Sequence, residues 1–230
     1  QIPARHGILG PLIRSIFIPE KDHEWGIFDY SQQEPRLVVH YASLRHFTGA
    51  GKFVDSYQED ETTDFHTMVS EMADIPRKQA KTINLGLFYG MGKGKLMSQL
   101  GVTLETASEL LASYNERVPF VKQLMNDTMN KAGKKGYLST LEGRRCRFDQ
   151  WEPTNEWGQK SLPLAEAQQQ YGEHMIKRAW TYKALNRLIQ GSAADQTKKA
   201  MLALAKEGYL AHIQVHDELD FSVASDADKA

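Results

Sequence analysis

The chain has 230 residues, of which 41% are hydrophobic and 25% charged, an ordinary composition for a globular protein. Its 28 Lys and Arg and 29 Asp and Glu leave a formal net charge of −1, which excludes a uniformly basic arm and disfavours a disordered polyelectrolyte. One cysteine, Cys146, excludes a disulfide framework and any site built from several cysteines, and it fits a reducing compartment. No stretch reaches the roughly 20 apolar residues of a membrane span, so we expect a soluble cytoplasmic protein.

The first half of the sequence predicts one strand followed by helices. The predicted elements, in chain order, are a strand over residues 25–28, a helix over 33–47, a solvated acidic loop over 55–64, a short helix over 65–72 and a longer helix from 76 to about 89. Leu37, Val38, Tyr41 and Leu44 share one side of the second element, which is expected to face the core. Because the chain lacks an initial Met and stops soon after an apolar run, we expect an internal fragment of a longer protein.

The second half predicts helices separated by two hairpins. The predicted elements are a helix starting near 103, a helix over 118–134, a hairpin of 137–140 with 144–148, helices over 164–188 and 193–206, and a hairpin of 211–215 with 219–223. The strands are sparse and far apart, with long helical stretches between them. This order predicts an α+β fold.

Acidic side chains stand at the ends of two predicted strands. Asp29 follows the first strand, and Asp217 and Glu218 lie at the tip of the last hairpin. If the two strands pair, these carboxylates meet at one sheet edge, where they repel each other unless a cation joins them. Oxygen ligands suit Mg²⁺, and the lack of clustered Cys or His argues against zinc. Ordinary turn residues are the alternative for either segment alone.

The predicted helix that follows Pro76 carries a row of residues at intervals of four. The row consists of Arg77, Lys81, Leu85 and Tyr89. The row is roughly 18 Å long. Its amino-terminal end combines cations with the positive pole of the helix, which suits a polyphosphate, and its far end offers apolar surface to a flat ring. A solvated basic helix face is the alternative. The following residues 90–95 fit no phosphate-loop spacing and predict a helix end with a mobile loop.

Positive charge is concentrated in three segments. Residues 77–100, 131–147 and 177–199 contain five, six and six cations, with none, one and one acid respectively. The last segment also contains Asn186 and Gln190, whose long amides, like that of Gln214, can reach acceptors in a nucleic-acid groove. Its cations are Lys177, Arg178, Lys183, Arg187, Lys198 and Lys199. This segregation suits a protein that binds phosphates with one face, although solvated helix faces explain the same residues.

Four segments resemble the motifs of family A DNA polymerases and occur in that family's order. Residues 29–36 (DYSQQEPR) resemble the first palm motif, DYSQIELR, and residues 77–90 (RKQAKTINLGLFYG) resemble the fingers helix, RxxxKxxNFGxxYG. Residues 190–195 (QGSAAD) resemble the family's QGSAAD segment. Residues 214–219 (QVHDEL) resemble its third motif, QVHDEL. Four ordered matches over nearly the whole chain are a very specific signal.

The resemblance implies a right-hand fold, with a palm built on a small antiparallel sheet, helical fingers, and a thumb upstream of residue 1. The implied boundaries of this partial polymerase domain are palm over 1–48, mainly fingers over 49–176 and palm over 177–230. The implied reaction is template-directed addition of deoxynucleotides to a primer 3′-hydroxyl by two-metal phosphoryl transfer. The implied partners are primer–template DNA and dNTPs, and two Mg²⁺ ions are the implied cofactor. A fragment without the thumb is expected to have little activity alone.

The motif positions imply roles for individual residues. Asp29 and Asp217 would hold both metal ions, with Tyr30 contributing its backbone carbonyl, Glu218 as an auxiliary acid and Lys81 as general acid for pyrophosphate. The implied nucleotide-contacting residues are Gln32, Glu34, His66, Arg77, Lys81, Leu85 and Tyr89. The implied DNA-contacting residues are Arg36, Asn186, Gln190, Gln214 and His216.

Two of these assignments carry a more specific expectation. Glu34 and Tyr89 match the pair that packs beneath the sugar and excludes a ribose 2′-hydroxyl. His66 matches a position that contacts the triphosphate, with a surface or capping histidine as the alternative.

Departures from the family pattern modify these expectations. Leu85 stands where the family has Phe or Tyr, which predicts altered discrimination against sugar analogues. Tyr182 stands where bacterial members often have Arg, so Lys183 or Arg187 would supply the charge. The stretch between 148 and 177 is longer than in bacterial enzymes and is either an insertion that packs on the fingers or a solvated loop. These variants resemble tailed-phage and plastid-type polymerases, which would place the protein in the host cytoplasm or a plastid.

Two other functions stay open at this point. A single-subunit RNA polymerase shares the palm chemistry but does not need Glu34 as a block. A catalytically inactive nucleic-acid-binding remnant predicts loss of the acids before loss of the folding residues, yet Asp29, Asp217, Lys81 and Arg77 are all present.

Overall fold

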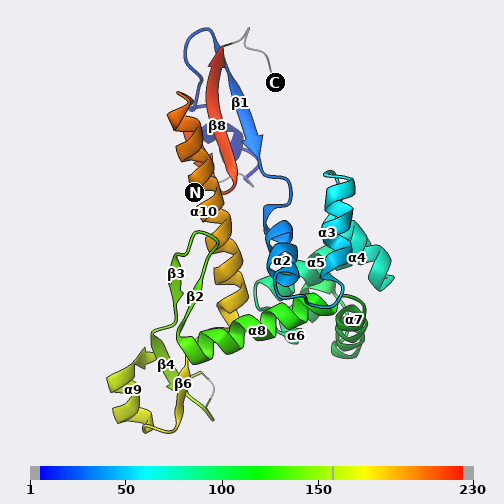
Figure 1. Cartoon of the computed structure of the whole chain (residues 1–230), viewed down its shortest axis with the longest axis vertical. Coiled ribbons are helices and arrows are strands. Elements are labelled where there is room, and N and C mark those ends of the chain that lie inside the picture. The colour runs from blue at the N-terminus through cyan, green and yellow to red at the C-terminus, as the bar shows by residue number, and fades with distance from the viewer. Residues whose placement is uncertain (1–5, 157, 225–230) are drawn as a thin grey trace. The chain divides into compact units, whose positions relative to one another are not determined.

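The computed structural model describes residues 6–156 and 158–224 (Figure 1). The chain divides into two compact units, which we call unit 1 (residues 1–31 and 196–230) and unit 2 (residues 32–195). Helices and small antiparallel sheets make up both, so the predicted α+β class is confirmed. Among the described residues, no helix combines the length and the apolar character needed to cross a membrane.

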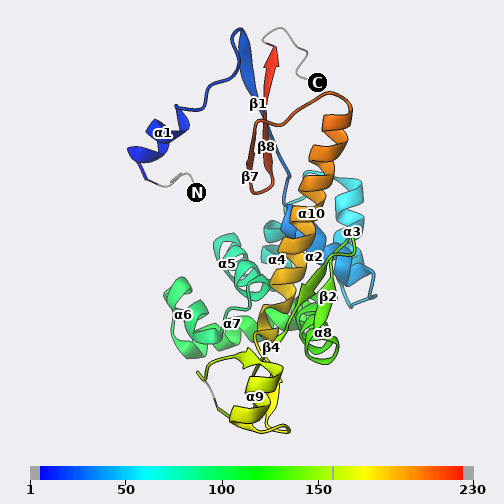
Figure 2. The ribbon, with the colours of Figure 1, turned by 90° about the vertical axis from the view of Figure 1, so that its left-hand side faces the viewer.

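Unit 1 is built on a sheet that joins the two ends of the sequence. Its strands β1 (His23–Asp29), β8 (Glu218–Ala224) and β7 (Ile213–Val215) are antiparallel in the order β1-β8-β7 (Figure 2). The pairing of β1 with β8 runs over seven residues, from His23 opposite Ala224 to Asp29 opposite Glu218. Helix α1 (Leu9–Arg14) precedes β1. The predicted strand and the predicted final hairpin are both confirmed.

Unit 2 begins with seven helices that enclose a common core. They are α2 (Gln33–Ser43), α3 (Ala50–Glu59), α4 (Phe65–Ala73), α5 (Arg77–Phe88), α6 (Lys93–Leu100), α7 (Leu104–Arg117) and α8 (Pro119–Lys135). At the centre, the ring of Phe53 lies 5.1 Å from those of Phe65 and Phe120, and Phe88 lies 6.0 Å from Phe65. All four rings are buried, so apolar burial, with tilted and edge-to-face ring contacts, holds the helices together.

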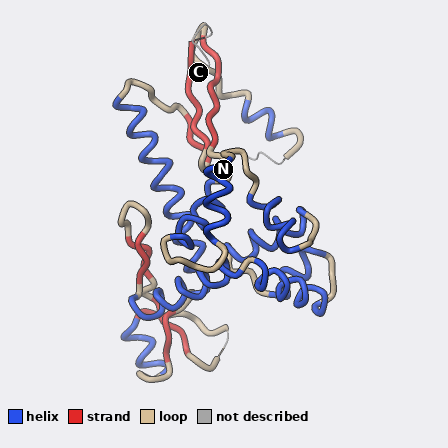
Figure 3. Tube along the Cα trace, turned by 45° about the vertical axis from the view of Figure 1, so that its right-hand side comes forward, coloured by secondary structure: helices blue, strands red, loops and turns tan. Residues whose placement is uncertain are grey.

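The rest of unit 2 contains two small sheets, shown as separate groups of red strands in Figure 3. The hairpin pairs β2 (Tyr137–Ser139) with β3 (Arg145–Arg147), as predicted. The second sheet has the order β5-β4-β6 and is followed by the long last helix. Its elements and the helices around it are β4 (Gln150–Pro153), β5 (Leu162–Pro163), α9 (Leu164–Tyr171), β6 (Ile176–Arg178), η1 (Thr181–Lys183) and α10 (Ala184–Lys206). This sheet and α9 occupy the stretch between 148 and 177, so the solvated-loop alternative for that stretch is wrong. Trp157, within the same stretch, lies outside the described residues.

Two predicted loops are helices in the structure. Much of the acidic segment 55–64 lies in α3, because Phe53 and Ala50 anchor one side of that helix in the core while the acids face outward. The segment after Gly90 contains α6, which buries Leu96. Leu44 follows the last residue of α2 and is 62% exposed, so its predicted place on the core side is wrong.

The predicted helix over 164–188 is interrupted. Helix α9 ends at Tyr171, because Gly172 adopts φ +89°, and β6 intervenes before α10 begins. By contrast, α10 continues through Gly191, where the hairpin approaches closely. A Cβ at position 191 would lie 3.0 Å from Thr140 Cγ2 and 3.2 Å from Arg144 Nη2. Glycine therefore allows the hairpin to pack on this helix.

Arg178 connects the second sheet to the end of α8. Its Nη1 donates to the carbonyl oxygen of Phe148 at 2.8 Å, and its guanidinium carbon lies 4.5 Å from the ring centre of Trp151. Gly136 ends α8 with φ +77°, and a Cβ there would lie 2.6 Å from the guanidinium carbon. Position 136 therefore requires glycine for both backbone conformation and space.

Replacing this glycine tests the packing. Gly136→Ala should reduce the free energy of unfolding by about 2–3 kcal/mol, since it strains the backbone and displaces the Arg178 guanidinium from its hydrogen bond. The matched control is Gly143→Ala, where φ is +79° but no atom lies within 4 Å of the added Cβ. That variant should lose only about 1 kcal/mol. Urea denaturation measures both, and equal losses would contradict a steric role for Arg178.

Candidate active site

The sheet of unit 1 brings the predicted acidic residues to one edge. Strand β1 ends at Asp29, which lies opposite Glu218, the first residue of β8, and Asp217 immediately precedes Glu218. Burial raises the pKa of Asp29, and the neighbouring Asp217 carboxylate raises it further, while a backbone hydrogen bond at Tyr30 opposes both. The prediction that these strands pair and bring their acids together is confirmed.

Further acids share this edge. Burial raises the pKa of Glu218, and the negative charges of Asp220, Asp29 and Asp217 add to the effect while Arg14 opposes it. The tight turn before β8 places His216 at φ +58°, in the left-handed region. The side-chain amide of Gln214 donates to the carbonyl oxygen of His216 at 3.1 Å. Gln214 and His216, the predicted DNA-contacting residues of unit 1, are thus exposed beside the acids.

The acids fit a divalent cation in charge and in ligand chemistry. Mutual repulsion adds to burial in raising the pKa values of Asp29 and Glu218, and a cation bound between the acids would relieve it. Carboxylate and carbonyl oxygens are ligands that Mg²⁺ prefers. Across the described ranges, no group of three or more His, Cys, Asp or Glu side chains is arranged to hold a metal ion. Asp29 and Asp217 would therefore hold a metal together with other oxygen donors, such as the Tyr30 carbonyl, water or a substrate phosphate.

Helix α5 of unit 2 carries the predicted nucleotide-contacting row. Arg77 and Lys81 are exposed near its amino terminus, and Leu85 is half-buried. Tyr89 follows the last helical residue and is 41% exposed. The opposite face buries Ala80, Ile83 and Phe88 in the core. Burial of that face is what leaves the predicted row accessible.

Arg77 is held by the residue that caps the neighbouring helix. Its Nη2 and Nε donate to the two carboxylate oxygens of Asp64 at 2.9 and 3.1 Å, and Nε also reaches the hydroxyl of Thr67 at 3.1 Å. Asp64 caps α4 by accepting from the backbone N–H of Thr67 at 2.7 Å. Burial acts to raise the pKa of Asp64, but the hydrogen bonds from Arg77 and Thr67 outweigh it and hold this pKa at about 2.

His66 is buried against α5, so the alternative of a surface histidine is wrong. Its Nδ1 lies 2.9 Å from the side-chain nitrogen of Asn84, and the hydroxyl of Tyr114 donates to the side-chain oxygen of Asn84. Because the amide nitrogen of Asn84 is a donor, Nδ1 accepts and the proton of a neutral ring is on Nε2. Burial lowers the pKa of His66; the Asp64 carboxylate opposes this effect, while Lys81 and Arg77 add to it. His66 thus retains one N–H donor.

Glu34, Tyr89 and Gln190 form one hydrogen-bonded group. The hydroxyl of Tyr89 donates to Glu34 Oε2 at 2.9 Å, and Tyr89 also has a side-chain hydrogen bond with Gln190. Burial and the Glu34 carboxylate raise the pKa of Tyr89 to about 12, so the phenol stays protonated at neutral pH. The structure therefore brings together the two residues predicted to select the sugar and adds a predicted DNA-contacting residue to them.

Gln32 and Arg36 both hold the segment before α4. The amide of Gln32 donates to the carbonyl oxygen of Thr63 at 2.9 Å and accepts from the backbone N–H of Phe65 at 2.7 Å. Arg36 donates to the backbone carbonyl of Glu61, and its guanidinium lies over the ring of Tyr57. Both side chains have structural partners, and their contacts to nucleotide and DNA stay predictions.

Sequence reasoning did not identify the contacts that fix α10 beside Gln190. Arg144 Nε donates to Asp195 at 2.8 Å, and its Nη2 donates to the carbonyl oxygen of Gly191 at 2.8 Å. Thr140 also donates to the nearly buried carboxylate of Asp195. The QGSAAD segment includes Asp195, but no local pattern shows that its partner is in a distant hairpin. Asn186 and Gln190 lie on the same helix, half-buried and exposed respectively.

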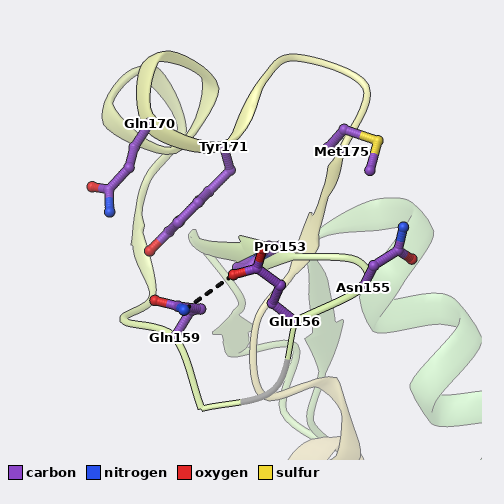
Figure 4. Close-up of a pocket in the computed structure, with 7 residues that line it drawn as sticks. All are labelled: Pro153, Asn155, Glu156, Gln159, Gln170, Tyr171 and Met175. Carbon is purple, nitrogen blue, oxygen red and sulfur yellow. Dashed lines mark hydrogen bonds between the residues drawn. The ribbon is translucent and has the colours of Figure 1, made fainter.

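A cavity of about 370 Å³ lies elsewhere in unit 2, between the second sheet and α9 (Figure 4). Seven residues line it: Pro153, Asn155, Glu156, Gln159, Gln170, Tyr171 and Met175. The side-chain amide of Gln159 donates to Glu156 across it at 3.0 Å. The lining includes none of the predicted site residues, so the cavity plays no part in the site.

The ion pair between Asp64 and Arg77 predicts a pH dependence of stability. The pKa of Asp64 is about 2 in the folded chain and 3.8 in its ordinary state, so its contribution is complete above pH 4 and is lost as the pH falls toward 2. In acid titrations of the free energy of unfolding, Asp64→Asn should flatten the curve between pH 4 and 2, because Asn keeps the helix cap but not the ion pair. Thr67→Val should have an intermediate slope. A wild-type slope in Asp64→Asn would contradict the assignment.

Comparisons with known proteins agree with this geometry. The family model for DNA polymerase family A matches residues 1–230. A DNA-directed DNA polymerase of Pseudomonas phage M6 is 38% identical over 264 aligned residues, which cover 97% of this chain and 36% of that protein. DNA polymerase I of Bacillus subtilis (strain 168) is 34% identical over 222 aligned residues, covering 92% of this chain and 23% of that protein.

A solved structure is also similar. It is the POL domain of Pol1 from M. smegmatis in complex with DNA primer-template and dNTP, with 29% identity and a TM-score of 0.73 over 98% of this chain and 38% of that one. The chain thus spans little more than a third of the length of the phage relative. The match of the family model over all 230 residues, with the motifs in order, shows that the chain belongs to DNA polymerase family A.

Proposed function

We propose that this chain is the part of a family A DNA polymerase that supplies the metal-binding carboxylates and the nucleotide-contacting helix. The whole protein would extend a DNA primer with deoxynucleotides in the order set by a template. The observation that carries the proposal is the pairing of β1 with β8, which brings Asp29 and Asp217 to one edge from opposite ends of the sequence. The proposal assigns residues 1–48 and 177–230 to the palm and 49–176 mainly to the fingers.

Unit 1 would provide the metal chemistry. Asp29 and Asp217, with the backbone carbonyl of Tyr30, would hold two Mg²⁺ ions. Such ions, when bound, lower the pKa of a primer 3′-hydroxyl and neutralise charge on the triphosphate and the leaving pyrophosphate. Glu218 stands beside them as an auxiliary acid, and burial together with its acidic neighbours favours its protonated form by raising its pKa.

Unit 2 would bind the triphosphate. Arg77 is oriented by Asp64, and a triphosphate offers this guanidinium more negative charge than one carboxylate does, which favours exchange of partners. Lys81 lies one turn further along α5 and would donate a proton to the departing pyrophosphate. The Nε2–H of His66 adds a donor without adding charge. The first two turns of α5 and the neighbouring α4 would therefore form the phosphate site.

The group around Tyr89 would select the sugar and support the DNA. The Glu34 carboxylate, held by the Tyr89 hydroxyl, would lie beneath the sugar, where a ribose 2′-hydroxyl could enter only by breaking that hydrogen bond. Gln190 connects the same group to α10, which also carries Asn186 for contact with the primer–template.

Primer extension by the complete reading frame that encodes this chain tests the proposal. Asp29→Asn should reduce the extension rate about a thousandfold, because a metal ligand stabilises the transition state by several kcal/mol. EDTA should abolish extension, and the control Asp55→Asn, an exposed acid on α3, should extend at the wild-type rate. Extension with ribonucleotides alone would favour an RNA polymerase. Absence of extension by the wild type would favour an inactive DNA-binding protein.

Competition between deoxy- and ribonucleotides tests the sugar-selecting pair. Glu34→Ala should increase ribonucleotide incorporation relative to deoxynucleotide about 10- to 100-fold, because the carboxylate that blocks the 2′-hydroxyl is gone. Tyr89→Phe, which keeps the ring but loses the hydrogen bond to Glu34, should have a smaller effect. Glu59→Ala, an exposed acid at the end of α3, is the control. Unchanged selectivity in Glu34→Ala would refute the assigned role.

A further inference from the structure

Three polar side chains from three helices are hydrogen-bonded to one another inside unit 2. Tyr114 on α7 and Asn84 on α5 are fully buried, and His66 on α4 is 7% exposed. The hydroxyl of Tyr114 donates to the side-chain oxygen of Asn84, and the side-chain nitrogen of Asn84 lies 2.9 Å from His66 Nδ1. We call these three residues the polar cluster.

The imidazole of His66 is the member of the polar cluster nearest to the cations of α5. Burial lowers the pKa of this ring, the Asp64 carboxylate opposes the shift, and the charges of Lys81 and Arg77 add to it. Across the described residues, Nε2 of the ring has no hydrogen-bond partner, and it is not among the fully buried polar atoms that lack one. Nε2 therefore reaches solvent, where its proton can serve a ligand that binds beside the two cations.

The orientation of the Asn84 amide decides which ring nitrogen carries the proton. With the amide nitrogen toward His66, Nδ1 accepts and the proton of the neutral ring is on Nε2. If the amide were turned over, its oxygen would face Nδ1 and would require the proton there instead. Nε2 would then be an acceptor, which repels the oxygens of a phosphate group.

The hydroxyl of Tyr114 selects the first of these orientations. A phenol can donate or accept, but burial raises the pKa of Tyr114, so the hydroxyl keeps a proton that needs an acceptor. Among residues 6–156 and 158–224, the oxygen of Asn84 is its only hydrogen-bond partner. Turning the amide over would put an N–H donor in place of that oxygen and leave the buried hydroxyl proton without an acceptor, which is costly.

We propose that Tyr114 is a positioning residue for nucleotide binding. Through the Asn84 amide, it fixes the His66 tautomer that presents the Nε2–H to the triphosphate. Tyr114 is fully buried, so it acts without touching the nucleotide. A donor whose proton is fixed in advance binds more tightly than one that must first change tautomer. This inference rests on the proposed function, because it takes the ligand of His66 to be a nucleoside triphosphate.

Single-nucleotide insertion by the complete reading frame that encodes this chain tests the inference. Tyr114→Phe keeps the buried ring but removes the hydroxyl, so either amide orientation then leaves one end of the Asn84 amide without a partner. The two tautomers of His66 become comparable in free energy. KM for the dNTP should rise about two- to tenfold, the reciprocal of the fraction of protein that keeps the donor tautomer, with kcat little changed.

The matched control is the same substitution at another buried phenol. The hydroxyl of Tyr57, on α3, is buried and has no hydrogen-bond partner within the described part of the chain. Tyr57→Phe removes that hydroxyl and keeps the ring, so it should leave KM for the dNTP unchanged. An equal rise of KM in Tyr57→Phe and Tyr114→Phe would overturn the inference, as would an unchanged KM in Tyr114→Phe.

A double-mutant cycle separates positioning from a general structural effect. His66→Ala removes the donor and should itself raise KM for the dNTP. In that background Tyr114→Phe should cause no further rise, because the residue through which it acts is absent. The same rise in both backgrounds would mean that loss of the hydroxyl disturbs α5 itself, and the positioning role would then be wrong.

Nuclear magnetic resonance reports the tautomer directly. In spectra of the ¹⁵N-histidine-labelled protein, the His66 signals are identified by their absence from His66→Ala. The wild-type ring should be protonated on Nε2, and Tyr114→Phe should add a form protonated on Nδ1. A Tyr114→Phe ring that is protonated on Nε2 alone would refute the inference while primer extension still supports the polymerase. Failure of the wild type to extend any primer would instead overturn the proposed function, whichever tautomer is found.

Discussion

The backbone pairing of β1 with β8 is the interaction on which the proposed chemistry depends. It joins residues near the two ends of the sequence and places Asp29 opposite Glu218, beside Asp217. Carboxylates this close repel each other, and the backbone hydrogen bonds of a seven-residue ladder hold them together despite that repulsion. Burial and this repulsion together raise the pKa of Asp29 and of Glu218. A cation bound between these acids would relieve the repulsion.

In unit 2, polar side chains are held by partners before any ligand arrives. Asp64 holds Arg77 by two hydrogen bonds, the Tyr89 hydroxyl holds Glu34, and Asn84 sets the tautomer of His66. Each partner limits the freedom of a side chain that would otherwise be flexible, which reduces the entropy lost on binding. The aromatic core beneath α5 supplies the rigid support for this arrangement, because it buries the opposite face of the helix.

Local sequence signals predicted several elements well. The apolar run ending at Asp29, the helix after Pro76 and the two hairpins all follow from patterns within a few residues, and all are present. Segments that depend on distant packing were predicted poorly. Residues 55–64 look like a polar connector until Phe53, on the helix that includes 55–59, is seen to pack on Phe65 and Phe120. Residues 164–188 look helical until β6 pairs with β4.

The sequence by itself determined the family, the α+β class and the residue types of the site, because motif spacing and helix periodicity are properties of short segments. Only the tertiary structure decided which side chains are partners. Asp64 and Arg77 are 13 residues apart, and Arg144 and Asp195 are 51 apart. No local pattern encodes such pairs, since they form only when packing of the core brings separate helices and hairpins into contact.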